Sequence, residues 1–182
     1  MYTDKPTSTL FPLSLQLPIL RHTRHLLPGG WIEQVEPSIP FHCDDNTLPP
    51  NSNLAGWGIK MTAINAETGK GIDTMNTMRA RIEAAGFTNI HEKLYKVPTG
   101  DWAKNKILKE AGRLNLIQFK QGMEGYIMFV LTRHGGWTPE EVQLYLAGIR
   151  KELDARPHVY QFTRRIWAQK PAVAQEASAS QA

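Results

Sequence analysis

The sequence predicts an α/β fold, because segments with the apolar spacing of helices alternate with three β-prone runs. The clearest unit lies at 21–36, where a basic helical turn leads into Pro28, Gly29 and Gly30. Pro28 cannot continue a helix, and a pair of glycines tolerates positive φ at a helix C-terminus. The β-prone run 31–36 follows at once. This stretch therefore predicts a helix, a tight turn and a strand, which together close a βαβ crossover.

Length and composition indicate one globular domain. The chain has 182 residues, of which 41% are hydrophobic and 21% charged, with a net charge of +4. This mildly basic balance does not by itself indicate nucleic-acid binding. The single cysteine, Cys43, excludes an intramolecular disulfide and suits a reducing compartment.

Hydrophobic runs in this sequence are short, and none approaches the ~20 apolar residues that cross a bilayer. The apolar stretch 10–20 contains two prolines and is not followed by a small-residue cleavage site, which argues against a signal peptide. Because its leucines would be unfavourable in water, we expect it to pack on the fold or to bind a partner. We expect an intracellular protein, in the cytoplasm or the nucleus, without membrane association.

The remaining elements follow from spacing and from turn residues along the chain. Residues 1–20 are expected to be irregular, 21–170 to fold, and 171–182 to form a polar, disordered tail. A loop rich in Pro, Asp and Asn follows the first strand. Helices are predicted at 53–65, 75–85, 103–131 and 138–153, and the other two strands at 87–97 and 159–168.

Two of these helices carry specific local signals. Gly122 and Gly125 are predicted to interrupt the helix 103–131, whose last part could be helix or strand on periodicity alone. Residues 138–141 are a strong helix start, with Thr as N-cap, Pro at the first helical position and Glu at the third.

Several short pieces resemble one enzyme family. The turn Leu-Pro-Gly-Gly-Trp-Ile-Glu within 27–36 resembles the turn that enters the fifth sheet strand of class I S-adenosylmethionine-dependent methyltransferases. The same stretch followed by 43–50 resembles the narrower fungal LaeA-like group, which is associated with secondary metabolism. Pieces at 84–87, 97–102 and 136–142 occur in matching order.

The resemblance covers about 21–171 and implies the C-terminal half of a Rossmann-like class I methyltransferase fold. Its three strands would be the last three of the family sheet, with the final strand antiparallel between the other two. The helices 103–131 and 138–153 would form an insertion that resembles a lid over the substrate. The implied activity is methyl transfer from S-adenosylmethionine to a small metabolite or a protein.

The cofactor-binding half of that family has no counterpart in the sequence. Such folds hold the cofactor with a Gly-rich turn after the first strand and an acid after the second. The G-x-G pairs at 56–58 and 69–71 neither extend further nor follow a hydrophobic strand, and only 26 residues precede Leu27. We therefore expect no cofactor-binding residues, and no S-adenosylmethionine binding by this chain alone.

Three explanations of this pattern are open: a gene fragment, a degenerate homologue with another role, or a homo-oligomer or partnered subunit whose sheet a second chain completes. The function is open between a methyltransferase-like protein that is inactive alone, a non-catalytic scaffold or partner-binding remnant, and a cofactor-independent enzyme acting on a small metabolite. A small-molecule acceptor is expected if the protein is active, and no nucleic acid is expected as a partner.

Four residues are candidates for a substrate pocket, and no catalytic residue is assigned. Glu36 lies near the end of the first strand, where α/β sheets place ligands, and points to the opposite face from Glu33. His42 could contact substrate as a base. The resemblance implies that Met123 and Tyr126 could line an aromatic substrate pocket.

Two other groups of polar residues are interpreted as structural. Residues 42–45, His-Cys-Asp-Asp, do not predict a metal site, because adjacent side chains rarely point at one ion. Cys43 is not expected to be a nucleophile, because His42 is too near in sequence to be well aimed. Arg164 and Arg165 interrupt the last strand, so one of them must face inward or lie at a sheet edge.

Overall fold

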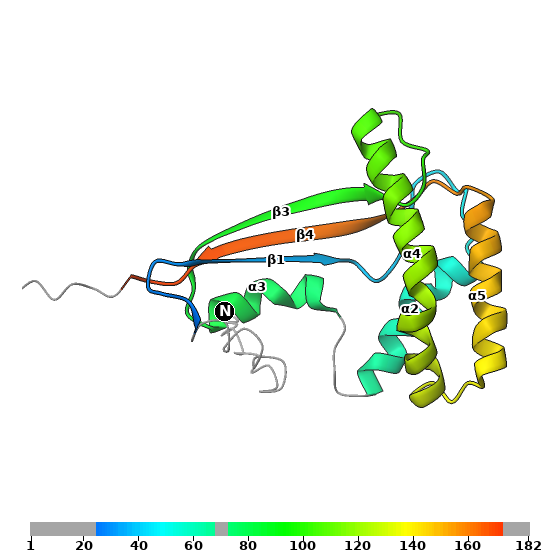
Figure 1. Cartoon of the computed structure of the whole chain (residues 1–182), viewed down its shortest axis with the longest axis horizontal. Helices are drawn as coiled ribbons and strands as arrows, with labels where there is room; N and C mark the ends of the chain where they lie inside the picture. Colours follow the sequence, from blue (N-terminus) through cyan, green and yellow to red (C-terminus); the bar gives the residue numbers. More distant parts are fainter. Residues whose placement is uncertain (1–24, 68–72, 173–182) are drawn as a thin grey trace, which may run out of the picture.

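The computed structural model describes residues 25–67 and 73–172 and confirms the α/β class (Figure 1). The predicted strands and the four helices after residue 50 are all present, with ends within three residues of the predicted ones. The segment 1–20, the glycine pair at 69–71 and nearly all of the tail 171–182 lie outside the described residues. The elements are β1 (Trp31–Pro37), β2 (His42–Cys43), α2 (Asn53–Glu67), α3 (Thr74–Ala84), β3 (Thr88–Pro98), α4 (Lys106–Arg133), α5 (Pro139–Asp154) and β4 (Val159–Gln169).

β4 is the central strand of the sheet and pairs antiparallel with β1 on one side and with β3 on the other. The register with β1 begins where Trp31 lies opposite Gln169. This arrangement confirms the expected strand order, with the last strand antiparallel between the other two. The two-residue strand β2 also pairs with β4, next to the β1 contact, where the sequence predicts only a loop.

Two hydrophobic clusters hold the helices and the sheet together (Figure 1). α3 covers one face of the sheet and packs Met78 and Ile82 against Ile166 and Ala168 of β4. The larger cluster joins α2, α4 and α5, which lie beyond the end of the sheet where β1 and β3 finish. Each fully buried aliphatic side chain stabilises the fold by roughly 1.5–3 kcal/mol. The fully buried members of the larger cluster include Leu54, Met61, Ile127 and Ile149.

α4 is one continuous helix of 28 residues, so the predicted interruption at Gly122 and Gly125 is wrong. Met123, Ile127 and Leu131 recur every four residues on its buried side. Their packing outweighs the ~1 kcal/mol by which each glycine disfavours a helix. No helix in the described part of the chain is both long enough and apolar enough to cross a membrane.

Side-chain caps fix the starts of α4 and α5. The Asn105 side chain accepts hydrogen bonds from the backbone N–H groups of Ile107 (2.9 Å) and Leu108 (3.1 Å), so α4 begins three residues later than predicted. The Thr138 hydroxyl accepts from the Glu141 N–H at 3.2 Å, and the Glu141 carboxylate accepts from the Thr138 N–H at 2.7 Å. This reciprocal capping box confirms the predicted helix start.

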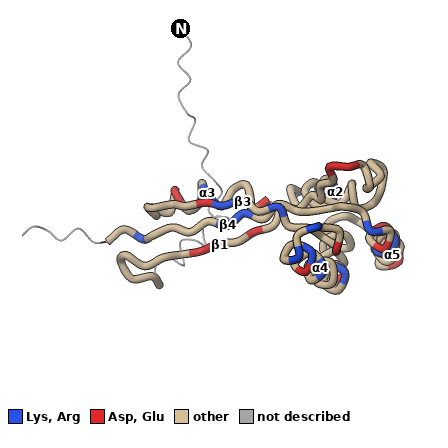
Figure 2. Tube along the Cα trace, turned by 90° about the horizontal axis from the view of Figure 1, so that it is seen from above, with Lys and Arg blue, Asp and Glu red and all other residues tan. Residues whose placement is uncertain are grey.

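β4 runs through Arg164 and Arg165 without a break. The two side chains lie on opposite faces of the strand, and each has an acidic partner. Arg164 Nε lies 3.6 Å from the Glu92 carboxylate. Arg165 pairs with Glu33 across to β1, and its guanidinium carbon lies 5.1 Å from the ring centroid of Trp167. Basic and acidic residues are interspersed along the strands and helices (Figure 2).

Candidate functional site

A cavity of about 750 Å³ lies beside the end of β1, between β4, α2 and the middle of α4. Glu36 lines it from β1, and Met123 and Tyr126 line it from α4. The fold therefore brings together three of the four residues predicted for a substrate pocket, although their role in binding is still a prediction. The volume lies within the ~300–1,000 Å³ of typical small-molecule pockets.

The inner wall of this cavity is aromatic and apolar. Trp57 of α2 meets Phe119 of α4 edge to face, with ring centroids 5.1 Å apart, and Phe41 meets the same Phe119 ring at 4.9 Å. Trp57 and Met123 are almost completely buried, whereas Tyr126 at the rim is 47% exposed. Because buried rings in contact have few alternative rotamers, the inner wall is held in one arrangement.

The backbone that follows Glu36 is fixed to β4 by hydrogen bonds. Ser38 is buried, and its hydroxyl accepts from the Phe162 N–H at 3.1 Å and donates to the Pro40 carbonyl at 3.0 Å. The Gln161 side-chain amide donates to the Ser38 carbonyl at 2.6 Å. These contacts set where β1 ends, and so they set where Glu36 faces the cavity.

Glu36 is the only residue charged at neutral pH among the described residues that line the cavity. The Gln34 side-chain amide donates to its carboxylate at 3.0 Å. Burial lowers the pKa of the nearby Arg81 guanidinium, and the negative charge of Glu36 opposes that change. Arg164, opposite Glu36 in the register, lies against Glu92. Since a carboxylate has about four acceptor positions, Glu36 can still accept from a donor in the cavity.

His42, the fourth predicted residue, does not line this cavity. Its ring stacks on Tyr160 with centroids 5.5 Å apart and lies 5.0 Å from the Phe162 ring. The imidazole therefore packs between aromatic rings of β4, and the structure supports no contact between His42 and a ligand in this cavity.

The acidic residues after His42 have separate partners. Asp44 pairs with Lys96 of β3 and accepts from the Tyr160 hydroxyl at 2.7 Å, and these bonds lower the pKa of its carboxyl group. Within the described residues, no group of three or more His, Cys, Asp or Glu side chains could hold a metal ion. Through its contacts with Lys96 and Tyr160, Asp44 ties the loop after β2 to the sheet.

Asp45 and His158 form a pair that the sequence does not reveal. The Asp45 carboxylate accepts from the Thr47 hydroxyl at 2.8 Å, contacts His158 Nδ1, and accepts from Cys43 Sγ at 3.3 Å. The bonds from Thr47 and His158 hold the pKa of this carboxyl well below its usual value. On the far side, the Trp102 ring stacks on the His158 ring at 5.4 Å.

An Asp–His pair orients an imidazole in many catalytic sites, but a nucleophile must then reach the other ring nitrogen. In the described residues no hydroxyl or thiol is hydrogen-bonded there, and the thiol of Cys43 lies against Asp45 instead. The pair therefore joins the loop after β2 to the start of β4. No sequence signal could have found it, because 113 residues separate the two side chains.

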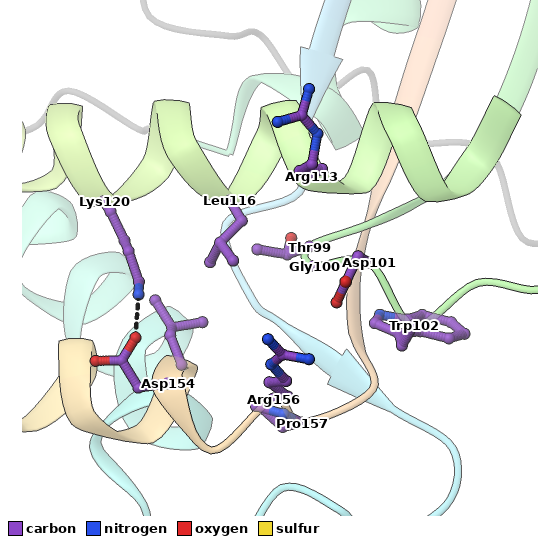
Figure 3. A pocket seen from close by; sticks show the side chains of 11 residues that line it. Thr99, Gly100, Asp101, Trp102, Arg113, Leu116, Lys120, Asp154, Arg156 and Pro157 are labelled. Carbon is purple, nitrogen blue, oxygen red and sulfur yellow. Dashed lines mark hydrogen bonds and ion pairs between the residues drawn. The ribbon is translucent and has the colours of Figure 1, made fainter. Parts of the chain in front are cut away.

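A second, smaller cavity of about 260 Å³ lies on the other flank of α4 (Figure 3). Its lining includes the cations Arg113, Lys120 and Arg156 and the acids Asp101 and Asp154. The Lys120 ammonium reaches Asp154, and Arg113 pairs with an acid of its own helix. Because most of these charges already have partners, this cavity is a weaker candidate for ligand binding than the one beside β1.

Comparison with curated proteins defines the class of this protein: its relatives are fungal methyltransferases. Methyltransferase pytC of Aspergillus terreus is 36% identical over 128 residues, which cover 70% of this chain and 40% of the relative. Probable methyltransferase tdiE of Emericella nidulans is 30% identical over 148 residues, covering 81% of this chain and 47% of the relative. No family model matches the chain.

The relatives also include regulators of secondary metabolism. Secondary metabolism regulator LAE1 of Cochliobolus heterostrophus is 34% identical over 151 residues, covering 81% of this chain and 49% of the relative. The chain is therefore a methyltransferase-like protein with LaeA-like homologues, which confirms the resemblance found in the sequence. It spans between 40% and 49% of the length of these three relatives.

Proposed function

We propose that this chain forms the acceptor-binding half of a Rossmann-like methyltransferase that acts in fungal secondary metabolism. The observation that carries this proposal is the cavity of about 750 Å³ beside the end of β1, because α/β sheets bind ligands at strand ends. The homology to fungal methyltransferases supports the reaction class. In such a reaction the protein acts mainly by positioning the acceptor and excluding water.

The residues described here do not fit S-adenosylmethionine. The one described G-x-G pair, Gly56 and Gly58, lies inside α2 rather than in a strand-to-helix turn. A Cβ at Gly58 would lie 2.6 Å from Pro40 Cα, so this glycine serves the close packing of α2 on the loop after β1. We therefore propose that the chain alone does not bind S-adenosylmethionine, and we derive no catalytic step through it.

A second chain or a second copy would then complete the sheet at β1. Within the described residues, β1 pairs only with β4, so its other edge carries unpaired backbone groups. Trp31 and Val35 of this strand are about half exposed. A free strand edge with apolar side chains recruits another strand, which also supports the second candidate function, a non-catalytic partner-binding module.

A chimeric protein tests the proposal. The part of methyltransferase pytC that precedes its match to this chain would be fused ahead of residue 25. Calorimetric titration with S-adenosylmethionine should then give a 1:1 site for the fusion and none for the chain alone. A stoichiometric micromolar site on the chain alone would contradict the proposal, as would a folded fusion without a site. Light scattering on the chain alone measures self-association, and a monomer at all concentrations would exclude the homo-oligomer.

A further inference from the structure

We propose that the cavity beside β1 takes a neutral aromatic molecule bearing a hydroxyl or ring N–H group that donates to Glu36. The role of this molecule as a methyl acceptor rests on the proposed function, whereas its binding to the cavity requires no cofactor. Four features of the cavity carry the inference: its charge, its aromatic wall, an open position in α4 and the uncharged helix surface that extends from it.

The charge of the lining residues disfavours anionic ligands. Glu36 carries the only formal charge among the described lining residues, and it has a single hydrogen bond, from Gln34. Partial burial raises the pKa of the Tyr126 phenol, so that group stays neutral and adds a polar hydroxyl only. A carboxylate or phosphate ligand would meet Glu36 without a lining cation to balance it, whereas a neutral O–H or N–H donor would form a charge-assisted bond.

The aromatic wall favours a planar ligand. The Trp57 and Phe119 rings meet edge to face at 5.1 Å, and Tyr126, which also lines the cavity, is half exposed. Aromatic rings bind another ring through offset-stacked or edge-to-face contacts worth about 0.5–1.5 kcal/mol beyond area burial. A bicyclic ligand can therefore gain contact with the aromatic side chains of both α2 and α4.

Gly122 leaves an opening in the α4 side of the cavity. A Cβ built on this residue meets no atom within 4 Å, although the residue lines the cavity. Gly125, less than one turn further along, is equally open but is not part of the lining. The two glycines therefore form a matched pair, in which a larger side chain at 122 would enter the cavity and the same side chain at 125 would not.

An uncharged surface of α4 continues from this opening. Residues with uncharged side chains recur there at helical spacing, and the charged residues of the same stretch follow other spacings around the helix. Leu114 and Phe129 are among the exposed apolar residues of this surface. A ligand larger than one ring system can therefore extend along α4 without meeting a charge. The uncharged positions are Leu114, Gln118, Gly122, Tyr126 and Phe129.

The test uses equilibrium dialysis of the full chain against three matched probes. We expect saturable 1:1 binding of 2-naphthol, at least fivefold weaker binding of 2-methoxynaphthalene, which lacks the donor, and at least tenfold weaker binding of 2-naphthoate. Glu36→Gln should remove most of the discrimination against 2-naphthoate. Equal affinity for 2-naphthol and 2-naphthoate in the unmodified chain would overturn the inference.

The glycine pair locates the binding site. Gly122→Leu should weaken 2-naphthol binding at least tenfold, and Gly125→Leu should leave it within twofold. Circular dichroism melting curves of both variants check that the fold is kept. If Gly122→Leu binds as the unmodified chain does, or if both variants lose binding equally, the ligand does not occupy this cavity.

These outcomes are separate from those of the chimera. Binding of 2-naphthol by the chain, together with a fusion that cannot bind S-adenosylmethionine, would keep this inference and reject the methyltransferase proposal. A fusion that binds S-adenosylmethionine, together with a chain that prefers 2-naphthoate, would keep that proposal and reject the neutral aromatic ligand.

Discussion

The backbone N–H of Gly100 donates to the carbonyl of Gly112 at 2.9 Å, where the loop after β3 crosses α4. A Cβ at Gly112 would lie 2.1 Å from the Gly100 carbonyl oxygen, so only glycine permits this approach. Asn115, one turn further along, donates to the Pro98 carbonyl at 3.0 Å and to the Thr99 hydroxyl at 2.9 Å. These contacts fix α4 against the sheet, and both cavities are lined by α4.

Gly112→Ala should therefore destabilise the protein by at least about 2 kcal/mol, because overpacking against backbone forces the helix to move. Gly125→Ala is the matched control in the same helix, since a Cβ there meets nothing within 4 Å. It should stabilise the protein by about 0.5–1 kcal/mol through helix propensity. Urea denaturation of the two variants measures both effects, and equal midpoints would show that the loop does not press on α4.

Thr138→Ala removes the side chain that caps α5. Loss of its bond from the Glu141 N–H should lower the free energy of unfolding by about 1 kcal/mol. Thr62→Ala, at an exposed position inside α2, is the control and should change stability by less than about 0.5 kcal/mol. An unchanged urea midpoint with unchanged slope for Thr138→Ala would mean that the capping box adds nothing in solution.

Local sequence signals predicted most of this fold, and the exceptions have local or long-range causes. The Thr138 start needs only residues within one turn, and the structure contains it. The interruption predicted at Gly122 and Gly125 is wrong because the low helix propensity of glycine is a weak signal beside buried contacts with other helices. The helix start was predicted three residues too early, at Ala103, although Asn105, which caps α4, is a residue type that favours this position.

The candidate site could be predicted only in part, because its geometry joins distant segments. The resemblance brought Met123 and Tyr126 into consideration, and the strand-end position did the same for Glu36. The position of His42 outside this cavity could not be predicted, because the aromatic rings that it contacts are more than 110 residues away on β4. The Asp45 pair with His158 has the same kind of separation, and no local pattern reports it.

Asp45 should contribute to stability above about pH 4 and lose that contribution in acid. Hydrogen bonds from Thr47 and His158 keep the pKa of this carboxyl lower in the folded than in the unfolded state. As pH falls below the unfolded value of about 3.9, the unfolded chain takes up the proton first and stability declines. Asp45→Asn should make this acid decline shallower in urea titrations between pH 5 and 2. An Asp45→Asn variant whose stability falls as steeply in acid as that of the unmodified chain would contradict this prediction.

Tyr145 gives the opposite dependence, at alkaline pH. Its ring is 7% exposed, and its hydroxyl donates to the Asn53 carbonyl at 3.1 Å. Burial, with a smaller contribution from the negative charge of Glu152, raises the pKa of Tyr145 to about 12. The unfolded phenol titrates near 10, so the unfolded chain releases its proton first as pH rises. The stabilising contribution is therefore complete below pH 10 and is lost between about pH 10 and 12.

Tyr145→Phe separates this contribution from other alkaline titrations, including that of Lys60, whose Nζ lies 4.4 Å from the ring centroid. At pH 7 the variant should be less stable by about 1 kcal/mol, because it lacks the hydroxyl bond to Asn53. Above pH 10 the difference should shrink and then reverse, since the variant has no phenol to deprotonate at position 145 and its other tyrosines are the same as in the unmodified chain. Urea denaturation at pH 7, 9, 10 and 11 measures the two free energies under matched conditions. A difference that stays constant over this range would mean that folding does not raise the pKa of Tyr145.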